Sequence, residues 1–315
     1  MVLDVMTASV FVMSLLVLGI SAQWIIKAAS NIARQLGVST YFIGFSIIAI
    51  GTSLPEMVSG IFASLEQHGT LVLGNVLGAN LLDATVVIGL AAIVGRKVTI
   101  SGKLFKTFDE TLLMSLGILL FPFLLGMDGV LSRLDGSILL GVFGFYVWRL
   151  YNRAEDGHGR KHLVWGQLLK DIFFLAVGMP ALIIAAHVFV GAATQLALDA
   201  GISLFIIGIT IVSLGTTLPE LVVQMTAVLD NKSGIGFGDT IGSIISNITL
   251  VLGVAAIINP LVFEPVSFLT AAAYMFMATF IALLFLHRRV ITWKEGVALF
   301  VIYGTFLISE VFLLA

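Results

Sequence analysis

Long apolar stretches, separated by short polar segments, run along almost the whole chain. Each is long enough to cross the hydrocarbon core of a bilayer as a helix, which takes roughly 20 residues. The pattern predicts ten spans, at 5–29, 40–65, 70–94, 108–126, 134–151, 165–190, 203–229, 235–258, 266–286 and 294–314. The first has no basic flank or clear cleavage site, so we interpret it as a retained helix and not a signal peptide. We therefore expect an all-α polytopic membrane protein without a soluble domain.

The two halves of this pattern repeat each other. A single constant offset superimposes 28–93 on 192–257 without a gap, so that Gly51–Glu56 falls on Gly215–Glu220. Each half has five spans, and an odd number forces the second half to enter the membrane upside down. We predict ten transmembrane helices as two inverted five-helix repeats, 1–151 and 165–315, joined by a polar cytoplasmic linker, 152–164.

Composition and charge place this chain in a membrane and orient it. Hydrophobic residues make up 59% of the chain and charged residues only 11%, which excludes an ordinary soluble domain. With the N-terminus outside, 14 of the 16 Lys and Arg residues fall on the internal side, Arg133 is external and Lys170 lies in the sixth span. This bias predicts a multi-pass protein of the cell membrane with both termini external. The absence of cysteine excludes disulfides, thiolate metal sites and cysteine nucleophiles.

The candidate chemistry lies in the repeated hexapeptide, which reads G-T-S-L-P-E at Gly51–Glu56 and G-T-T-L-P-E at Gly215–Glu220. Glu56 and Glu220 fall near the middle of their spans, where a carboxylate is costly and usually functional. Each preceding proline lacks an N–H and so frees a backbone carbonyl one turn earlier. Hydroxyl oxygens one turn before each acid come from Thr52, Ser53, Thr216 and Thr217. Paired interruptions of this kind point to the binding site of a secondary transporter.

Spans three and eight supply polar partners at the same depth. Asp83 follows Glu56 at the same separation in sequence as Asn247 follows Glu220. Ser243 lies one turn before Asn247 on the same helix face. Carboxylate, hydroxyl and carbonyl oxygens are hard donors, which suit Ca²⁺, with its roughly 6–8 ligands, and Na⁺ rather than a softer transition metal.

Several polar residues nearby keep two interpretations. Asn80 and Ser246 either contact the site or form ordinary interhelical hydrogen bonds. Asp239, near the inner end of the eighth span, is expected to cap that helix or to reach water. Gln224 either lines the site or bonds to a neighbouring helix, and His187 is interpreted as a packed or interfacial residue and not as a ligand.

Together, these residues resemble the cation/calcium antiporter superfamily, and most closely the microbial sodium/calcium exchangers. The resemblance covers the whole chain and rests on the ten spans, the inverted halves and both hexapeptides. It implies that spans two, three, seven and eight form a central ion site, against which spans one and six slide as gates. The ligands it implies are side chains of Thr52, Ser53, Glu56, Asp83, Thr216, Thr217, Glu220, Ser243 and Asn247, and main-chain carbonyls of Ala49 and Ser213.

Two positions depart from the family pattern. Microbial exchangers carry Asn in span three and Asp in span eight, whereas this chain has Asp83 and Asn247. The acid has changed sides, but the number of carboxylates is kept. Ala79 also stands where the family has a ligand serine, which affects one monovalent-ion site.

Charge arithmetic favours antiport. Three ionised carboxylates are neutralised by three monovalent cations, while one Ca²⁺ leaves one negative charge, so the two loads compete. We therefore expect a secondary-active antiporter that exchanges Ca²⁺ for Na⁺ by alternating access. We expect no enzymatic activity, no cofactor, no nucleic-acid partner and a monomer whose only partners are these ions and the lipid bilayer. Protons compete for such carboxylates, so a proton- or potassium-coupled calcium/cation antiporter is the alternative.

Two other classes fit less well. Gly236–Asp239 matches the G-x-G-D motif of intramembrane aspartyl proteases, and Pro180–Leu182 matches their P-A-L motif. Their order is reversed, however, and no Tyr-Asp pair supplies a second acid. A passive channel does not account for the repeat with broken helices as well as alternating access does.

Overall fold

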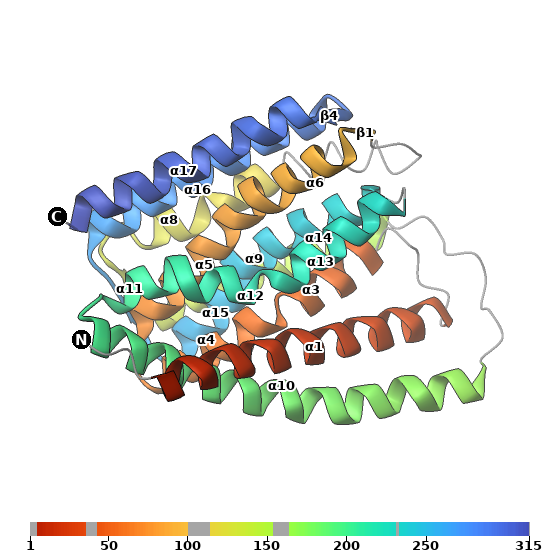
Figure 1. Ribbon diagram of the computed structural model, residues 1–315, viewed down its shortest axis with the longest axis horizontal. Helices are drawn as coiled ribbons and strands as arrows, with labels where there is room; N and C mark the ends of the chain where they lie inside the picture. The colour runs from red at the N-terminus through yellow and green to blue at the C-terminus, as the bar shows by residue number, and fades with distance from the viewer. Residues whose placement is uncertain (1–4, 36–42, 100–113, 154–163, 231–232, 315) are drawn as a thin grey trace.

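The computed structural model describes residues 5–35, 43–99, 114–153, 164–230 and 233–314, and most of them form helices along the long axis of the molecule (Figure 1). The helices of the first half are α1 (Val5–Gln35), the π-helical turn η1 (Ile43–Ile48), α3 (Ala49–Thr52), α4 (Leu54–Leu65), α5 (Gly69–Leu82), the π-helical turn η2 (Asp83–Val87), α6 (Ile88–Gly95), α8 (Phe121–Leu125) and α9 (Arg133–Arg153). Those of the second half are α10 (Trp165–Ala200), α11 (Leu204–Ile207), η3 (Gly208–Val212), α12 (Ser213–Thr216), α13 (Leu218–Leu229), α14 (Ser233–Ser246), η4 (Asn247–Val251), α15 (Leu252–Ile258), α16 (Pro265–His287) and α17 (Trp293–Leu314).

Membrane-length helices are found in both halves. Among the described residues, five helices are long and apolar enough to cross a bilayer: Met6–Ile32, Gly69–Gly95, Trp165–Ala200, Ser233–Ile258 and Pro265–His287. Two bent helix pairs, Ser46–Leu65 and Leu204–Leu229, raise this number to seven if each is one span. The start of the predicted fourth span lies outside the described residues, and a shorter apolar helix, Met114–Leu125, covers its end.

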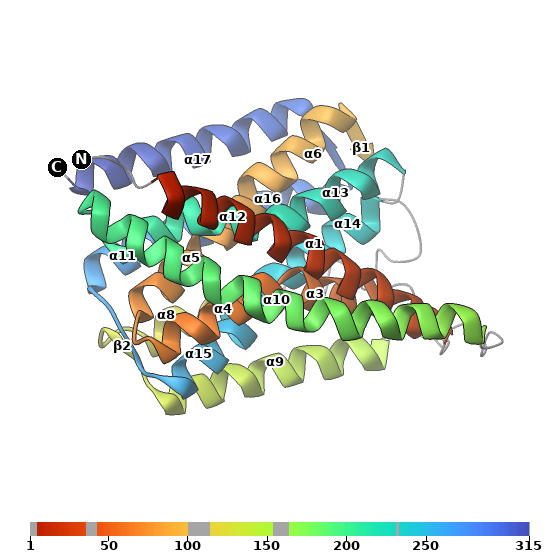
Figure 2. The same ribbon diagram turned by 60° about the horizontal axis from the view of Figure 1, so that its bottom comes forward.

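The internal repeat reappears in the element boundaries. When the offset that aligns the two hexapeptides is applied, α3, α4, α5 and η2 coincide with α12, α13, α14 and η4. The helices α1 and α10, which correspond to each other in the repeat, lie side by side and run in opposite directions in both views (Figures 1 and 2). The similar sequences therefore fold into similar elements, and this first pair of elements is antiparallel.

The spans that carry the hexapeptides are bent where the sequence places the prolines. The chain turns by 47° between α3 and α4, and by 41° between α12 and α13. Pro55 and Pro219 are the second residues of α4 and α13, a position where the missing N–H costs no helical hydrogen bond. Each bend thus lies within one turn of a hexapeptide glutamate.

The interior of the molecule is formed by the third and eighth predicted spans. In Gly69–Gly95 and Ser233–Ile258, 83% and 78% of an 18-residue apolar stretch is buried inside the protein, whereas the corresponding shares are 39% in α1 and 28% in α10. Close packing requires glycine here, because a Cβ atom on Gly74 or Gly78 of α5 would collide with backbone carbonyl oxygens of α11 and η3. These two glycines therefore allow α5 to pack closely against α11 and η3.

The expectation of a purely helical chain was wrong in detail. Two antiparallel two-stranded sheets pair β1 (Lys97–Thr99) with β4 (Val290–Thr292) and β2 (Val130–Leu131) with β3 (Leu261–Val262). Each sheet joins one strand from each half, and the sheets lie at opposite ends of the molecule (Figure 2). Such short pairs between helix ends leave no periodic signal in a sequence dominated by apolar helices.

Several predicted boundaries also need correction. The first span ends at Gln35 and the sixth at Ala200, because polar residues at their ends remain helical, and Pro180 does not end α10. The helix α9 continues to Arg153, past the start of the predicted linker at Asn152. The rest of that linker up to residue 163 lies outside the described residues, as do Lys103, Lys106, Arg160, Lys161 and Lys232 of the charge bias.

Candidate functional site

The broken helix of each half packs against the third helix of the other half. The turn η1 and helix α3 contact α14, and η3 and α12 contact α5 in the same way. Both hexapeptides therefore face a helix that the other half supplies. All eleven residues predicted to form the site are buried, none more than 4% exposed: Ala49, Thr52, Ser53, Glu56, Asp83, Ser213, Thr216, Thr217, Glu220, Ser243 and Asn247.

One cluster of oxygens forms between α3 and α14. Thr52 Oγ1 lies 3.1 Å from the Ala49 carbonyl oxygen, 3.1 Å from Asp239 Oδ1 and 2.8 Å from Ser243 Oγ. Ser243 Oγ also donates to the Ala49 carbonyl at 3.3 Å. A hydroxyl carries one proton and can donate one hydrogen bond at a time, so the two hydroxyls cannot satisfy all four oxygens as acceptors. The cluster has more acceptor capacity than donors.

The equivalent cluster between α12 and α5 is simpler. Thr216 Oγ1 donates to Asn75 Oδ1 at 3.0 Å, with the Ser213 carbonyl oxygen 3.4 Å away. Ala79, which has no hydroxyl, stands where the other cluster has Ser243. This cluster therefore has the neutral amide of Asn75 where the other has the carboxylate of Asp239, and it lacks the hydroxyl that Ser243 supplies there.

Asn80 and Asn247 connect α5 to η4. Asn247 Nδ2 donates to Asn80 Oδ1 at 3.0 Å, and Asn80 Nδ2 donates to the Ile244 carbonyl at 3.2 Å. Asn80 thus forms an interhelical hydrogen bond, the second of its two interpretations. The bond fixes the amide of Asn247 so that its Oδ1 is buried without a partner. This orientation leaves Asn247 Oδ1 available as an acceptor.

The carboxylates of the site are buried without hydrogen-bond partners. Both oxygens of Glu56, Asp83 and Glu220 lack a partner within the described residues. Glu56 and Glu220 repel each other electrostatically, and Asp83 is repelled by both. Ser53 Oγ and Thr217 Oγ1 are likewise buried and unpaired. Unpaired buried charges are strongly unfavourable, so this arrangement is suited to a positive ion that supplies the missing interactions.

Acidic side chains alone do not form a metal site. In the parts of the chain that the structure describes, no three His, Asp or Glu side chains group closely enough to hold a metal ion. A cation here would need the hydroxyl, amide and carbonyl oxygens of the two clusters as well as the carboxylates. Ca²⁺ and Na⁺ both accept such mixed oxygen ligands.

Asp239 was wrongly expected to cap a helix or reach water. It lies within α14, is 0% exposed and accepts a hydrogen bond from Thr52. Sequence reasoning also missed Asn75 as the partner of Thr216. The repeat makes Asn75 and Asp239 equivalent, which is the signal that could have linked the two. Gln224 bonds to a neighbouring helix, since its Oε1 accepts from Thr240 of α14 at 3.2 Å.

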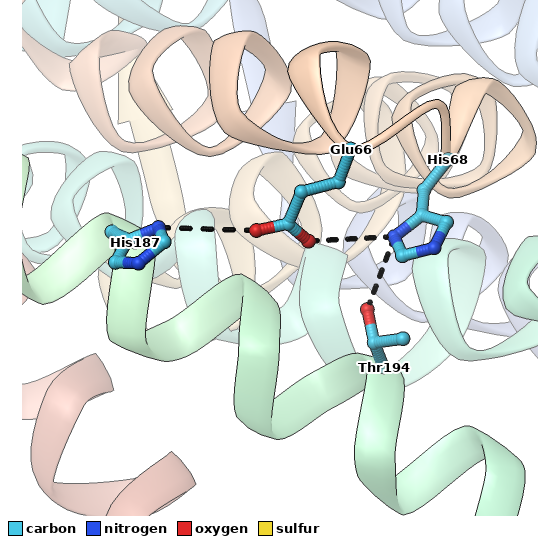
Figure 3. A network of polar contacts seen from close by, with 4 residues as sticks. All are labelled: Glu66, His68, His187 and Thr194. Atoms are coloured by element: carbon cyan, nitrogen blue, oxygen red, sulfur yellow. Dashed lines mark hydrogen bonds and ion pairs between the residues drawn. The ribbon is translucent and has the colours of Figure 1, made fainter.

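A separate polar network lies where α4 ends against α10 (Figure 3). Glu66 lies 3.5 Å from His68 Nδ1 and 3.8 Å from His187 Nδ1, and Thr194 Oγ1 lies 3.4 Å from His68. The ring of His187 packs against Phe62 with centroids 4.9 Å apart, and its side chain is 60% exposed. His187 therefore packs against Phe62 of α4, while more than half of its side chain is exposed.

A cavity of about 660 Å³ lies between α1 and α10. Its lining includes Lys27, Arg34, Lys170 and Asp171. The carboxylate of Asp171 accepts hydrogen bonds from Gln167 of its own helix and from Asn31 of α1, and the bond from Asn31 ties the two helices together. None of the predicted site residues lines this cavity.

A profile of the sodium/calcium exchanger protein family matches residues 6–152 and 170–312 of this chain. The chain is 30% identical to the sodium/calcium exchanger MaX1 of Methanosarcina acetivorans over 329 aligned positions, which cover 91% of this chain and 93% of that protein. It is 32% identical to the inner membrane protein YrbG of Escherichia coli, over 90% of each chain. A solved structure of the sodium-calcium exchanger NCX_Mj, soaked with 2.5 mM Na⁺ and 10 mM Sr²⁺, superimposes with a TM-score of 0.73. It is 28% identical and covers 97% of this chain and 99% of that one.

Proposed function

The chain belongs to the sodium/calcium exchanger protein family, and on this basis we propose that it exchanges Ca²⁺ for Na⁺ across the cell membrane. It does so as a secondary-active antiporter, without a cofactor and without enzymatic chemistry. The similarity to solved exchanger structures over nearly the whole chain supports the proposal. The protease alternative gains no support from relatives that are named as exchangers or antiporters.

One observation carries the proposal for the site. Six carboxylate oxygens, on Glu56, Asp83 and Glu220, are buried at the contact between the halves with no hydrogen-bond partner among the described residues. Breaking a buried ion pair by removing one partner costs roughly 3–5 kcal/mol, and here the partners are missing for three acids at once. Cations that enter and leave would supply these partners in turn.

The proposed ligands combine acids with neutral oxygens. Carboxylates come from Glu56, Glu220 and Asp83, and neutral oxygens come from Asn247, Thr52, Ser53, Thr216, Thr217, Ser243 and the carbonyls of Ala49 and Ser213. Three Na⁺ would neutralise three carboxylates, whereas one Ca²⁺ would leave one negative charge. Since both loads need the same oxygens, they exclude each other, and exchanging them moves net charge across the membrane.

The proposed architecture is ten transmembrane helices in two inverted repeats, 1–151 and 165–315, with both termini external. The coinciding element boundaries and the antiparallel pair α1 and α10 support the inversion. The start of α1 and the end of α17 lie at the same end of the molecule, opposite to the β1–β4 sheet (Figure 1). In the proposed alternating access, the pair α1 and α10 slides across the buried site as a gate, and the chain acts as a monomer.

The test is ion flux in liposomes that contain the purified protein. Vesicles loaded with Na⁺ and diluted into Na⁺-free medium should take up ⁴⁵Ca²⁺, and an imposed membrane potential should change the rate. Vesicles loaded with K⁺ or choline, or carrying only a pH gradient, serve as controls. Equal uptake without Na⁺, together with dependence on the pH gradient, would replace the sodium-coupled function with a proton-coupled one.

A further inference from the structure

Asp239 is a buried acid that the proposed exchange does not use. Its Oδ1 accepts a hydrogen bond from Thr52, and its Oδ2 is buried with no partner. No Lys, Arg or His of the described residues forms an ion pair with it, and Glu220 repels it. The side chain therefore brings a charge into the protein interior that nothing in the described protein balances.

The repeat provides an internal control for the structural role of this residue. Asn75 occupies the equivalent position in α5 and accepts a hydrogen bond from Thr216 at 3.0 Å, as Asp239 accepts one from Thr52 at 3.1 Å. A neutral amide is therefore enough to orient the threonine of the hexapeptide. The negative charge of Asp239 is not needed for this bond, and burying it carries a large free-energy cost.

The surroundings of Asp239 are those of a cation site. Thr52 Oγ1, Ser243 Oγ and the Ala49 carbonyl oxygen lie within 2.8–3.3 Å of one another, and Asp239 Oδ1 joins them through Thr52. Every one of these atoms can ligate a hard cation, and they share few protons. In the equivalent cluster between α12 and α5, Ala79 stands in place of Ser243 and Asn75 in place of Asp239, so both the hydroxyl and the charge are absent.

We propose that Asp239 is a fourth cation-binding carboxylate, which holds a Na⁺ ion together with Thr52, Ser243 and the Ala49 carbonyl. The inference rests on the proposed exchange and adds Asp239 to the ligands proposed for it. Asp239 lies one turn, about 6 Å along the helix axis, before Ser243 and about 12 Å before Asn247. Asp239 therefore stands nearer the start of α14 than Asn247 does.

The test compares Asp239→Asn with Asp239→Ala. The asparagine variant recreates the Asn75–Thr216 pair at this position, so it removes the charge but keeps the acceptor for Thr52. Both variants should raise the Na⁺ concentration that half-saturates Na⁺-driven Ca²⁺ flux by at least about tenfold, as the loss of a buried charge partner does. Wild-type behaviour of Asp239→Asn, alongside a defective Asp239→Ala, would show that Asp239 is only a hydrogen-bond acceptor and would overturn the proposal.

A binding measurement separates this inference from the proposed exchange. Thermal unfolding of the purified protein in detergent is followed as NaCl replaces choline chloride at constant ionic strength, without Ca²⁺. Na⁺ should raise the melting temperature of the wild-type protein at concentrations about tenfold lower than for Asp239→Asn. If wild-type vesicles show no Na⁺-driven Ca²⁺ flux but this difference persists, the exchange function fails and the Na⁺ position stands. If the flux is present and both proteins respond to Na⁺ alike, the exchange function stands and the role of Asp239 is refuted.

Discussion

The two halves of this protein have closely similar backbones and different charges at the site. Both have a π-helical turn, a bend and a proline before the glutamate, at equivalent positions of the repeat. Around these shared features, Asp83 corresponds to Asn247 and Asn75 to Asp239. Each half therefore places its one additional acid on a different turn of the equivalent helix. The comparison teaches that the backbone defines where ligands can stand, while single side chains decide which of those places is charged.

The strongest test of the comparison uses the residues that the halves share. Glu56→Gln and Glu220→Gln each keep the shape of the side chain and remove one charge from the proposed ion shell. Each should lower Na⁺-driven Ca²⁺ flux at least about 100-fold, the factor that corresponds to roughly 3 kcal/mol of lost interaction. Flux in liposomes is the measurement, and size-exclusion chromatography controls for folding. Near-normal flux in one variant alone would mean that the halves are not functionally equivalent.

The inversion of the halves predicts opposite exposure of two polar sites. Because the chain has no cysteine, Thr99→Cys after the third span and Ser267→Cys after the eighth can each be labelled alone in intact cells. An impermeant maleimide should label Ser267→Cys and leave Thr99→Cys unlabelled until the cells are opened. The labelled fraction is read from a gel shift, and both sites should react fully in detergent. Labelling of Thr99→Cys in intact cells would reverse the proposed orientation.

The change in Ca²⁺ flux expected from moving the acid from one half to the other is smaller than the loss expected for the glutamate variants. Asp83→Asn should weaken Ca²⁺ flux severely, because it leaves two of the three carboxylates of the proposed site. The double variant Asp83→Asn/Asn247→Asp restores the count on the other side of the site and should recover flux at least about fivefold over Asp83→Asn alone. All four variants form a double-mutant cycle. Effects that add without rescue would place the two side chains in separate sites.

The smallest change concerns packing between the halves. Gly78→Ala puts a Cβ atom against the Ile209 carbonyl and Ser213 Oγ and should destabilise the protein by about 1–3 kcal/mol. Gly141→Ala in α9 is the matched control, since no atom lies within 4 Å of the added Cβ. Melting temperatures of both variants in detergent give the comparison. Equal melting temperatures would mean that α5 can move away from η3 at little cost.

Much of this fold could be predicted because its signals are local. Apolar runs of membrane length predicted the helical spans Gly69–Gly95, Ser233–Ile258 and Pro265–His287 to within a few residues, and the prolines at 55 and 219 marked the two bends. The long ends of α1 and α10 were missed, because polar residues in a helix outside the apolar core look like loop residues. The strand pairs β1–β4 and β2–β3 were missed because strand pairing joins segments that are distant in sequence.

The sequence by itself determined which residue types the proposed site contains and at which equivalent positions of the two halves they stand, because both follow from the repeat and from helical spacing. Only the tertiary structure decided which residues share a cluster. Thr52 contacts Asp239 and Ser243 of the other half, and Thr216 contacts Asn75, since each broken helix packs against the third helix of the opposite repeat. The physical reason is that such contacts depend on how the two repeats pack together, and helical spacing within one repeat carries no record of that packing.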